Sequence, residues 1–452
     1  MRQVTPAWKL LAAVLSLLLT VFVWQKGLQE SFSRPSVAPK LSLSQQEMAL
    51  VASPALPKSI KPFLVGLEPK NALKKTLHDI PLDQIEDRER IVLAAIEQTK
   101  KKRSELLNFE LKDETLLLVQ KAFLSKSNLD KLPLLTSTDF EQIKENDPLL
   151  YQVSCFALGG TDAQCINKRA SSYMALRLLG VQGLPLIATI VGVGLLIRQA
   201  WMRFQKKSIP WPRLTPIPLS SIDMVLLVAG GFVVLGEVLL PTFVVPLSSY
   251  LTKDFSGPVN DSFKVFVGYS AMTLPPLFLL RQQLNSLRNL EPPNGGWLQW
   301  RLKPIQTAIC QAINGWLMVM PFVLLSGLLM NFFIGDQGGS NPLLELVLSS
   351  HNNLALLLLL ATTVILAPAF EELIFRGALL PVIAGKLGVF WGIIVSAFVF
   401  ALAHLSVGEL PPLFVLGLGL GILRISSGRL FPCAIMHSLW NGITFANLLL
   451  LG

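Results

Sequence analysis

The chain has 452 residues, of which 52% are hydrophobic and only 15% are charged. This composition is too apolar for a soluble protein of that length and indicates a polytopic membrane protein. The formal net charge is +10, and residues 171–452 hold 16 Lys and Arg against 10 Asp and Glu. Because cytoplasmic loops of membrane proteins are rich in Lys and Arg, we interpret this surplus as an orientation signal. We therefore expect membrane lipid around the chain and no nucleic-acid partner.

Residues 1–24 contain an apolar run from Trp8 to Trp24 that is interrupted only by Lys9, Ser16 and Thr20. Such a run is typical of a signal peptide or a signal anchor. No small-x-small cleavage site follows it. We expect an uncleaved anchor with its amino terminus in the cytoplasm.

Residues 25–170 differ from the rest of the chain, with a proline-containing linker followed by charged and apolar residues at helical spacing over 83–107 and 111–124. This pattern predicts a mainly helical extramembrane domain, whose partner the sequence does not name. Cys155 and Cys165 are ten residues apart in this domain, and this spacing allows either a disulfide or two free thiols. No C-x-x-C pair occurs, so a structural zinc site is not supported.

From residue 171 onward, uncharged runs follow one another at lengths near the roughly 20 residues that a spanning helix needs. They fall at 181–197, 224–245, 265–280, 308–334, 354–370 and onward, 389–403, 413–423 and 430–450. We expect an all-α, polytopic bundle of about eight helices after the anchor, with additional membrane helices in 171–349 followed by a membrane core in 350–452, whose polar residues are described next. Basic residues gather after the first and third runs, which places those loops in the cytoplasm and the 25–170 domain on the opposite side.

The stretch around Glu371, Glu372 and Arg376 places three ionisable groups inside an apolar helix. Such groups are costly in a membrane and mark a functional site by default. Glu372 and Arg376 are four residues apart and share a helix face, so they can pair. Glu371 is rotated from Glu372 by about 100°, so it need not share that arginine and is the better candidate for a water-activating carboxylate.

Two further polar groups lie in the apolar helices that follow, at His404 and at His437 with Asn441. His437 and Asn441 are four apart on one face, and both can donate hydrogen bonds to an oxyanion that develops as water attacks an amide. His404 can hold that water beside Glu371. Together these residues supply a base, a water ligand and an oxyanion site for peptide hydrolysis without a Ser or Cys nucleophile.

Three motifs carry a resemblance to a known family. They are Glu-Glu-x-x-x-Arg at 371–376, Phe-x-x-x-His at 400–404 and His-x-x-x-Asn at 437–441. They resemble the CAAX protease and bacteriocin-processing enzyme family of intramembrane proteases, over about residues 350–450. The resemblance implies an all-helical membrane fold with Glu371 as base, His404 as its partner, His437 with Asn441 as oxyanion hole, Glu372 assisting and Arg376 structural. Phe400 belongs to the same motif set as structural support.

The depth of these residues sets a geometric requirement. A helix ending near residue 370 would leave Glu371 at the membrane edge, away from His404. We therefore expect one long helix over about 354–384, with a kink near Pro368, so that the glutamates lie near mid-depth.

Metal dependence is left open. Glu371, His404 and His437 together form a known type of zinc ligand set, but no His-Glu-x-x-His helix is present. A metal-free glutamate mechanism without cofactor is favoured, and a zinc protease is the variant.

The sequence thus predicts a CAAX endopeptidase-like intramembrane protease that cleaves a membrane-associated or lipidated protein or peptide. One alternative is a catalytically silent scaffold or assembly factor on the same fold. Another is a transporter with Glu237 and Glu371 as a proton relay, although Glu237 is interpreted as a structural carboxylate paired with a donor. Gly417-x-x-x-Gly421 is interpreted as a helix-packing face. The substrate and the particular membrane are not determined.

Overall fold

The computed structural model describes residues 6–34, 36–80, 85–97, 99–124, 138–207, 210–253, 255–335 and 339–452. These residues form helices joined by turns and loops, and no strand occurs among them. The all-α expectation is therefore confirmed. The helices divide into two units, which are described separately: residues 1–37 with 186–450 and 452, and residues 38–185 with 451.

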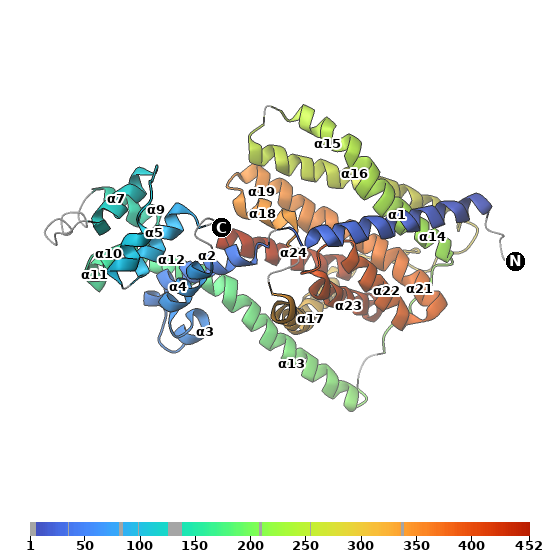
Figure 1. The fold of residues 1–452 in the computed structure, drawn as a ribbon. Helices are drawn as coiled ribbons and strands as arrows, with labels where there is room; N and C mark the ends of the chain where they lie inside the picture. Colours follow the sequence, from blue (N-terminus) through green and yellow to red (C-terminus); the bar gives the residue numbers. More distant parts are fainter. Residues whose placement is uncertain are drawn as a thin grey trace. The chain divides into compact units, whose positions relative to one another are not determined.

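The first unit holds the membrane helices (Figure 1). Across the described chain, eight helices are long and apolar enough to span a membrane, and the shorter α22 (Val389–Leu402) is also apolar. The expected anchor followed by about eight helices is therefore confirmed, and the protein is an integral, multi-pass membrane protein. Besides α22, the elements of this unit are α1 (Ala7–Ser31), α13 (Leu184–Phe204), α14 (Ser221–Val225), η3 (Leu226–Leu239), α15 (Leu240–Leu251), α16 (Gly257–Asn285), α17 (Ile305–Ile334), α18 (Pro342–Ser349), α19 (Asn353–Leu360), η4 (Ala361–Leu366), α20 (Ala367–Glu372), η5 (Leu373–Leu379), α21 (Leu380–Leu387), α23 (Leu410–Ser427) and α24 (Phe431–Leu451).

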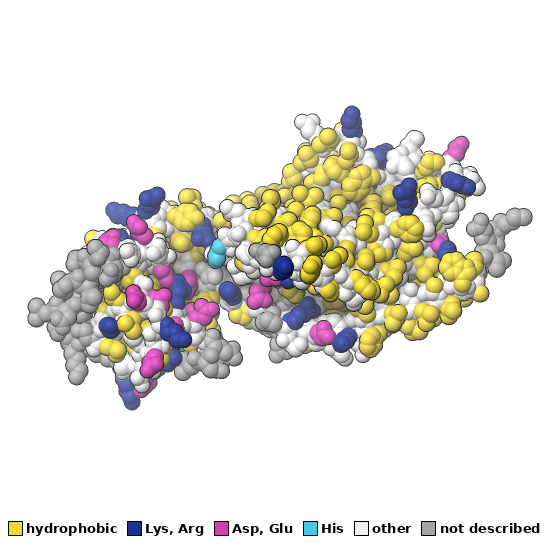
Figure 2. Space-filling view, turned by 90° about the horizontal axis from the view of Figure 1, so that it is seen from above, with side chains coloured by type: hydrophobic (Ala, Val, Ile, Leu, Met, Phe, Trp, Pro, Cys, Tyr) yellow, Lys and Arg dark blue, Asp and Glu magenta, His cyan; other side chains and the backbone are white. Residues whose placement is uncertain are grey.

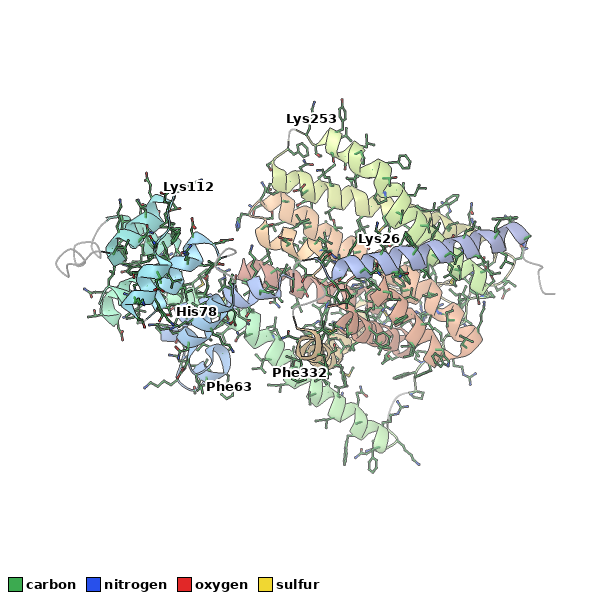
Figure 3. All side chains as sticks on the ribbon, viewed as in Figure 1. Lys26, Phe63, His78, Lys112, Lys253 and Phe332 are labelled. Atoms are coloured by element: carbon green, nitrogen blue, oxygen red, sulfur yellow. A yellow bond between two sulfur atoms is a disulfide. The ribbon has the colours of Figure 1, made fainter. Side chains whose placement is uncertain are left out.

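The outside of this unit is hydrophobic, as contact with lipid requires. Figure 2 shows hydrophobic side chains across most of its visible face. Phe332 of α17 is 81% exposed, and Lys253 lies in the loop between α15 and α16 (Figure 3).

The anchor helix α1 packs against the bundle along one of its faces, and most of its large hydrophobic side chains stay exposed. It lies beside α14 and η3, where Thr20 donates a hydrogen bond of 3.2 Å to the Ala229 carbonyl and Lys9 forms an ion pair with Asp223. The helix continues past residue 24 to Ser31. The anchor is therefore a structural member of the membrane unit.

Close packing of α22 on α23 relies on two glycines. A Cβ on Gly417 would lie 3.0 Å from the Ala397 Cα, and one on Gly421 would lie 3.0 Å from the Ile393 side chain. The expectation of a packing face at these glycines is confirmed, because small residues let helix backbones approach.

The second unit is a separate helical domain with its own core. Its core includes Leu73, Leu77, Ile91 and Phe140, each fully buried. Figure 2 shows Lys, Arg, Asp and Glu over its visible face, as expected of a domain outside the membrane. The helices of this unit are α2 (Ala38–Ala52), η1 (Ser53–Ala55), α3 (Lys61–Val65), α4 (Pro69–Asp79), α5 (Asp87–Ile96), α6 (Lys100–Leu106), α7 (Glu114–Leu124), α9 (Thr138–Asn146), α10 (Pro148–Ala157), α11 (Asp162–Cys165), α12 (Lys168–Leu178) and η2 (Leu179–Gly183).

A disulfide joins Cys155 to Cys165 in this second unit, which settles the alternative that the sequence left open. It links α10 to α11 across a sequence separation of 10 residues.

Arg88 adds an ion-pair contact in this unit, since it bonds Asp147 at 2.6 Å and Glu47 at 2.9 Å. Residues 83 and 84, where a helix was expected to begin, lie outside the described residues.

Candidate active site

The helix that carries the glutamates runs without a break from Asn353 to Leu387. The long helix expected over about 354–384 is therefore confirmed. Asn352 caps its start, because the Asn352 side chain accepts hydrogen bonds from the amides of Leu354 and Ala355 at 2.9 and 3.1 Å. Two π-helical segments, η4 and η5, flank the six residues of α20 that hold the glutamates. Such segments occur often at functional sites, because they alter how neighbouring side chains are directed.

Glu372 is engaged in a buried charge cluster. Its Oε1 accepts hydrogen bonds from Arg376 Nη1 at 2.8 Å and from His437 Nδ1 at 3.0 Å. Glu372 and Arg376 are both fully buried. The same guanidinium donates to the Gly417 carbonyl at 3.2 Å and lies 4.4 Å over the ring of Phe400. Glu372 and Arg376 thus compensate each other inside the bundle, where an isolated charge would be costly.

Glu371 is held differently. Its Oε1 accepts a hydrogen bond of 2.7 Å from the hydroxyl of Tyr269 on α16. Its Oε2 is buried and has no hydrogen-bond partner among the described residues, and His437 Nε2 lies 3.9 Å from it. One oxygen of this carboxylate is therefore positioned, and the other is left to accept a bond from a bound molecule.

A cavity of about 480 Å³ lies next to Glu371. Glu371, His404 and Asn441 all line it, so three of the predicted site residues meet at one space. The remaining lining is mostly apolar, with Phe375, Leu416 and Trp440 among its members. A concave, mainly apolar space with a few convergent polar groups is the usual form of a substrate site.

His404 follows the end of α22 and belongs to a loop held by the anchor helix. Its Nδ1 lies 2.9 Å from the Phe400 carbonyl, which can only accept, so Nδ1 carries a hydrogen and the Nε2 lone pair is free in the neutral ring. The next residues of this loop contact α1. The Val407 amide donates to Ser31 at 3.0 Å, and Arg34 donates to the Leu405 carbonyl.

Asn441 and His437 share a face of α24, as their spacing predicts, but they have different surroundings. Asn441 lines the cavity, and its Nδ2 donates to the Thr363 carbonyl at 2.8 Å. Since an amide nitrogen carries two hydrogens, one remains for another acceptor. His437 is not among the cavity-lining residues and lies behind Glu371, bonded to Glu372. Glu371, His404 and Asn441 therefore line the cavity, whereas His437 contacts the two glutamates and not the cavity.

Tyr269 and Glu237 are among the cavity residues that were not expected at the site. Tyr269 had no distinguishing signal, because a single tyrosine in a membrane helix is common near the interfaces. Glu237 was interpreted as a carboxylate paired with a donor, yet its buried Oε2 has no hydrogen-bond partner in the described part of the chain, and the side chain lines the cavity. Both residues come from helices before residue 350.

The donors around Glu371 do not fit a zinc ion as they are placed. Within the described residues, no three His, Cys, Asp or Glu side chains are grouped so that they could hold one metal ion. His437 Nδ1 is bonded to Glu372, and its Nε2 is 3.9 Å from Glu371. We therefore derive no step through a metal.

Two family models match the chain. Residues 353–443 match the family described as type II CAAX prenyl endopeptidase Rce1-like. Residues 38–176 match a domain of unknown function, DUF8675. No curated protein and no solved structure matches the chain. Residues 353–443 therefore form an Rce1-like domain of the CAAX protease family, as the three motifs predicted, and it holds Glu371, His404, His437 and Asn441.

Proposed function

We propose that the protein is an intramembrane endopeptidase that hydrolyses peptide bonds of membrane-associated or lipidated substrates with water activated by Glu371. The observation that carries this proposal is that Glu371, whose Oε2 has no hydrogen-bond partner among the described residues, lines the same cavity as His404 and Asn441. The match of residues 353–443 to a family described as prenyl endopeptidases supports this proposal. A general base must lie within hydrogen-bond reach of the water that it deprotonates.

In the proposed reaction, water lies between Glu371 Oε2 and His404 Nε2. Glu371 accepts the proton as the water oxygen bonds to the carbonyl carbon of the substrate. Asn441 donates its remaining amide hydrogen to the oxyanion, which preorganised donors stabilise strongly in a dry site. The carbon–nitrogen bond then breaks, and Glu371 passes its proton to the leaving amine. His437 positions both glutamates.

The substrate is proposed from the apolar nature of the site and from the family description. A cavity lined mainly by apolar residues inside a membrane bundle admits a peptide that is already at the membrane. Proteins with a carboxyl-terminal prenyl group are one such class, because the matching family is described as prenyl endopeptidases. Other membrane proteins form the second class of substrate.

We further propose that the basic loops face the cytoplasm and that residues 25–170 lie on the opposite side. The excess of Lys and Arg after the first and third apolar runs supports this orientation. The Cys155–Cys165 disulfide supports it independently, since disulfides persist outside reducing compartments. On that side the domain would select or hold a partner for the membrane site.

The experiment compares host membranes that contain the wild-type chain, Glu371→Gln or Glu345→Gln, with new protein termini quantified by mass spectrometry. Glu345 is an exposed glutamate outside the cavity lining and controls for loss of a carboxylate. We expect the same new termini with wild type and Glu345→Gln, and none with Glu371→Gln. Identical termini with Glu371→Gln would leave the scaffold function as the better account.

A further inference from the structure

A second cavity, of about 1110 Å³, lies between α13, α17 and α23. No described residue lines both this cavity and the one at Glu371. Its volume exceeds the roughly 300–1,000 Å³ of usual small-molecule pockets, so it suits a bulky ligand. The α13 helix, which forms one wall, lies outside the Rce1-like domain.

Helix crossings close one part of this cavity. A Cβ on Gly192 of α13 would lie 2.0 Å from the Leu317 carbonyl of α17, so the two backbones touch there. A Cβ on Gly419 of α23 would lie 2.6 Å from the Val319 side chain of α17. The cavity thus lies between packed helices and opens to the surface of the unit, where Arg198, Arg203 and Phe322 are exposed.

Polar and apolar lining residues separate along the helices. On α17, Gln311 and Asn314 come first, and Phe322 follows about 16 Å along the axis from Gln311. On α23 the order is reversed, with Leu418 before Ser426. The two helices are antiparallel here, because Arg429, just after α23, bonds Gln311 at 2.7 Å. One end of the cavity is therefore polar, and the other end is apolar.

The polar end also carries positive charge. Arg198 and Arg203 of α13 line it, and neither forms an ion pair with any acidic side chain that the structure describes. Arg203 lies 6.0 Å from the ring of Trp211, which also lines the cavity, and the next residue, Pro212, lies against Gly428 just after α23, at the polar end. Trp201 stacks on Phe204 nearby in α13. Aromatic side chains of this kind gather at the level of lipid headgroups, which fixes the depth of the charged end.

We propose that this cavity binds an anionic glycerophospholipid, with the phosphate at Arg198 and Arg203 and an acyl chain along the apolar wall of α17 and α23. Basic pockets between membrane helices bind anionic headgroups in this way. The two arginines have no acidic partner among the described residues and can bind an anion, and the adjoining hydrocarbon wall suits the acyl chain that an inorganic ion lacks. This inference is independent of peptide hydrolysis at Glu371.

The test measures lipid retained by the purified full-length protein in native mass spectrometry. Phosphatidylglycerol and phosphatidylcholine with the same acyl chains are supplied in separate samples. We expect retention of phosphatidylglycerol and a roughly tenfold to thirtyfold weaker retention by Arg198→Gln/Arg203→Gln, since each basic residue near a headgroup contributes about 1 kcal/mol. The control Lys207→Gln/Arg213→Gln removes two positive charges outside the cavity and should retain phosphatidylglycerol as the wild type does.

A second variant keeps the test decisive if the arginine variant does not fold. Leu418→Trp places a larger side chain in the apolar part and should reduce retention of phosphatidylglycerol while both arginines stay in place. Equal retention of the two lipids by the wild type would overturn the proposal. An equal loss in the Lys207→Gln/Arg213→Gln control, or full retention by Leu418→Trp, would overturn it as well.

Discussion

Tyr269 donates a hydrogen bond of 2.7 Å to Glu371 and so ties α16 to the helix of the Rce1-like domain. The bond uses Oε1 and leaves Oε2 free. A helix outside the matched domain therefore orients the proposed base.

Removal of that hydroxyl should slow turnover. A hydrogen bond to a charged group contributes about 1.5–3 kcal/mol, so Tyr269→Phe should lower kcat by roughly tenfold to a hundredfold. KM should change little, because the bond orients the base and does not hold the substrate. Steady-state kinetics on a substrate identified from the new termini would show this. Tyr250→Phe, at an exposed tyrosine of α15, is the control, and a raised KM at constant kcat in Tyr269→Phe would contradict the proposed role.

The two neighbouring glutamates should respond differently to the same substitution. Glu372→Gln leaves the fully buried Arg376 without its charge partner, which should cost about 3–5 kcal/mol of folding stability. Glu371→Gln keeps the size and polarity of a side chain that already lacks a charged partner within hydrogen-bond distance, so its melting temperature should stay near that of the wild type. Thermal unfolding in detergent separates the two. Equal melting temperatures for both variants would show that the Glu372–Arg376 pair does not stabilise the bundle.

The glycine at the α22–α23 crossing should not tolerate a side chain. In Gly417→Ala the added methyl would lie 3.0 Å from Ala397 and 3.2 Å from Arg376 Nη2, so these neighbours must move by a few tenths of an ångström. We expect a loss of about 1–3 kcal/mol, as for other overpacked sites. Gly194→Ala on α13 meets nothing within 4 Å and should be neutral or slightly stabilising, because alanine favours helix. A melting temperature for Gly417→Ala at or above that of Gly194→Ala would argue against close packing at this crossing.

The disulfide should stabilise the second unit and leave the membrane unit unaffected. Cys155→Ser/Cys165→Ser opens a short loop, and native disulfides of small domains contribute about 2–4 kcal/mol. Hydrogen exchange of the full-length protein should show faster exchange in α10 and α11 and unchanged exchange in α24. Cys310→Ser removes a free, exposed cysteine and is the matched control. Unchanged protection of α10 would mean that the hydrophobic core alone holds this region.

The sequence predicted the helices and the charge pair because both follow from local spacing. Uncharged runs define spans, and four-residue spacing pairs Glu372 with Arg376. It did not predict Tyr269 or the position of Glu237 in the cavity, since both depend on how α16 and η3 pack against the glutamate helix. The contacts of His437 with Glu371 and Glu372 depend on how α24 is rotated within the bundle, which spacing along α24 alone does not determine.

The bonds from the anchor to the loop after His404 bear on how the protein is made. Ser31 and Val407 are 376 residues apart, so a ribosome completes the first membrane helix long before the loop that it contacts. The early helix must stay in the membrane until that late loop arrives. The proposed activity would then depend on completed assembly, because the loop after His404 is held in place only after residue 407 has contacted Ser31.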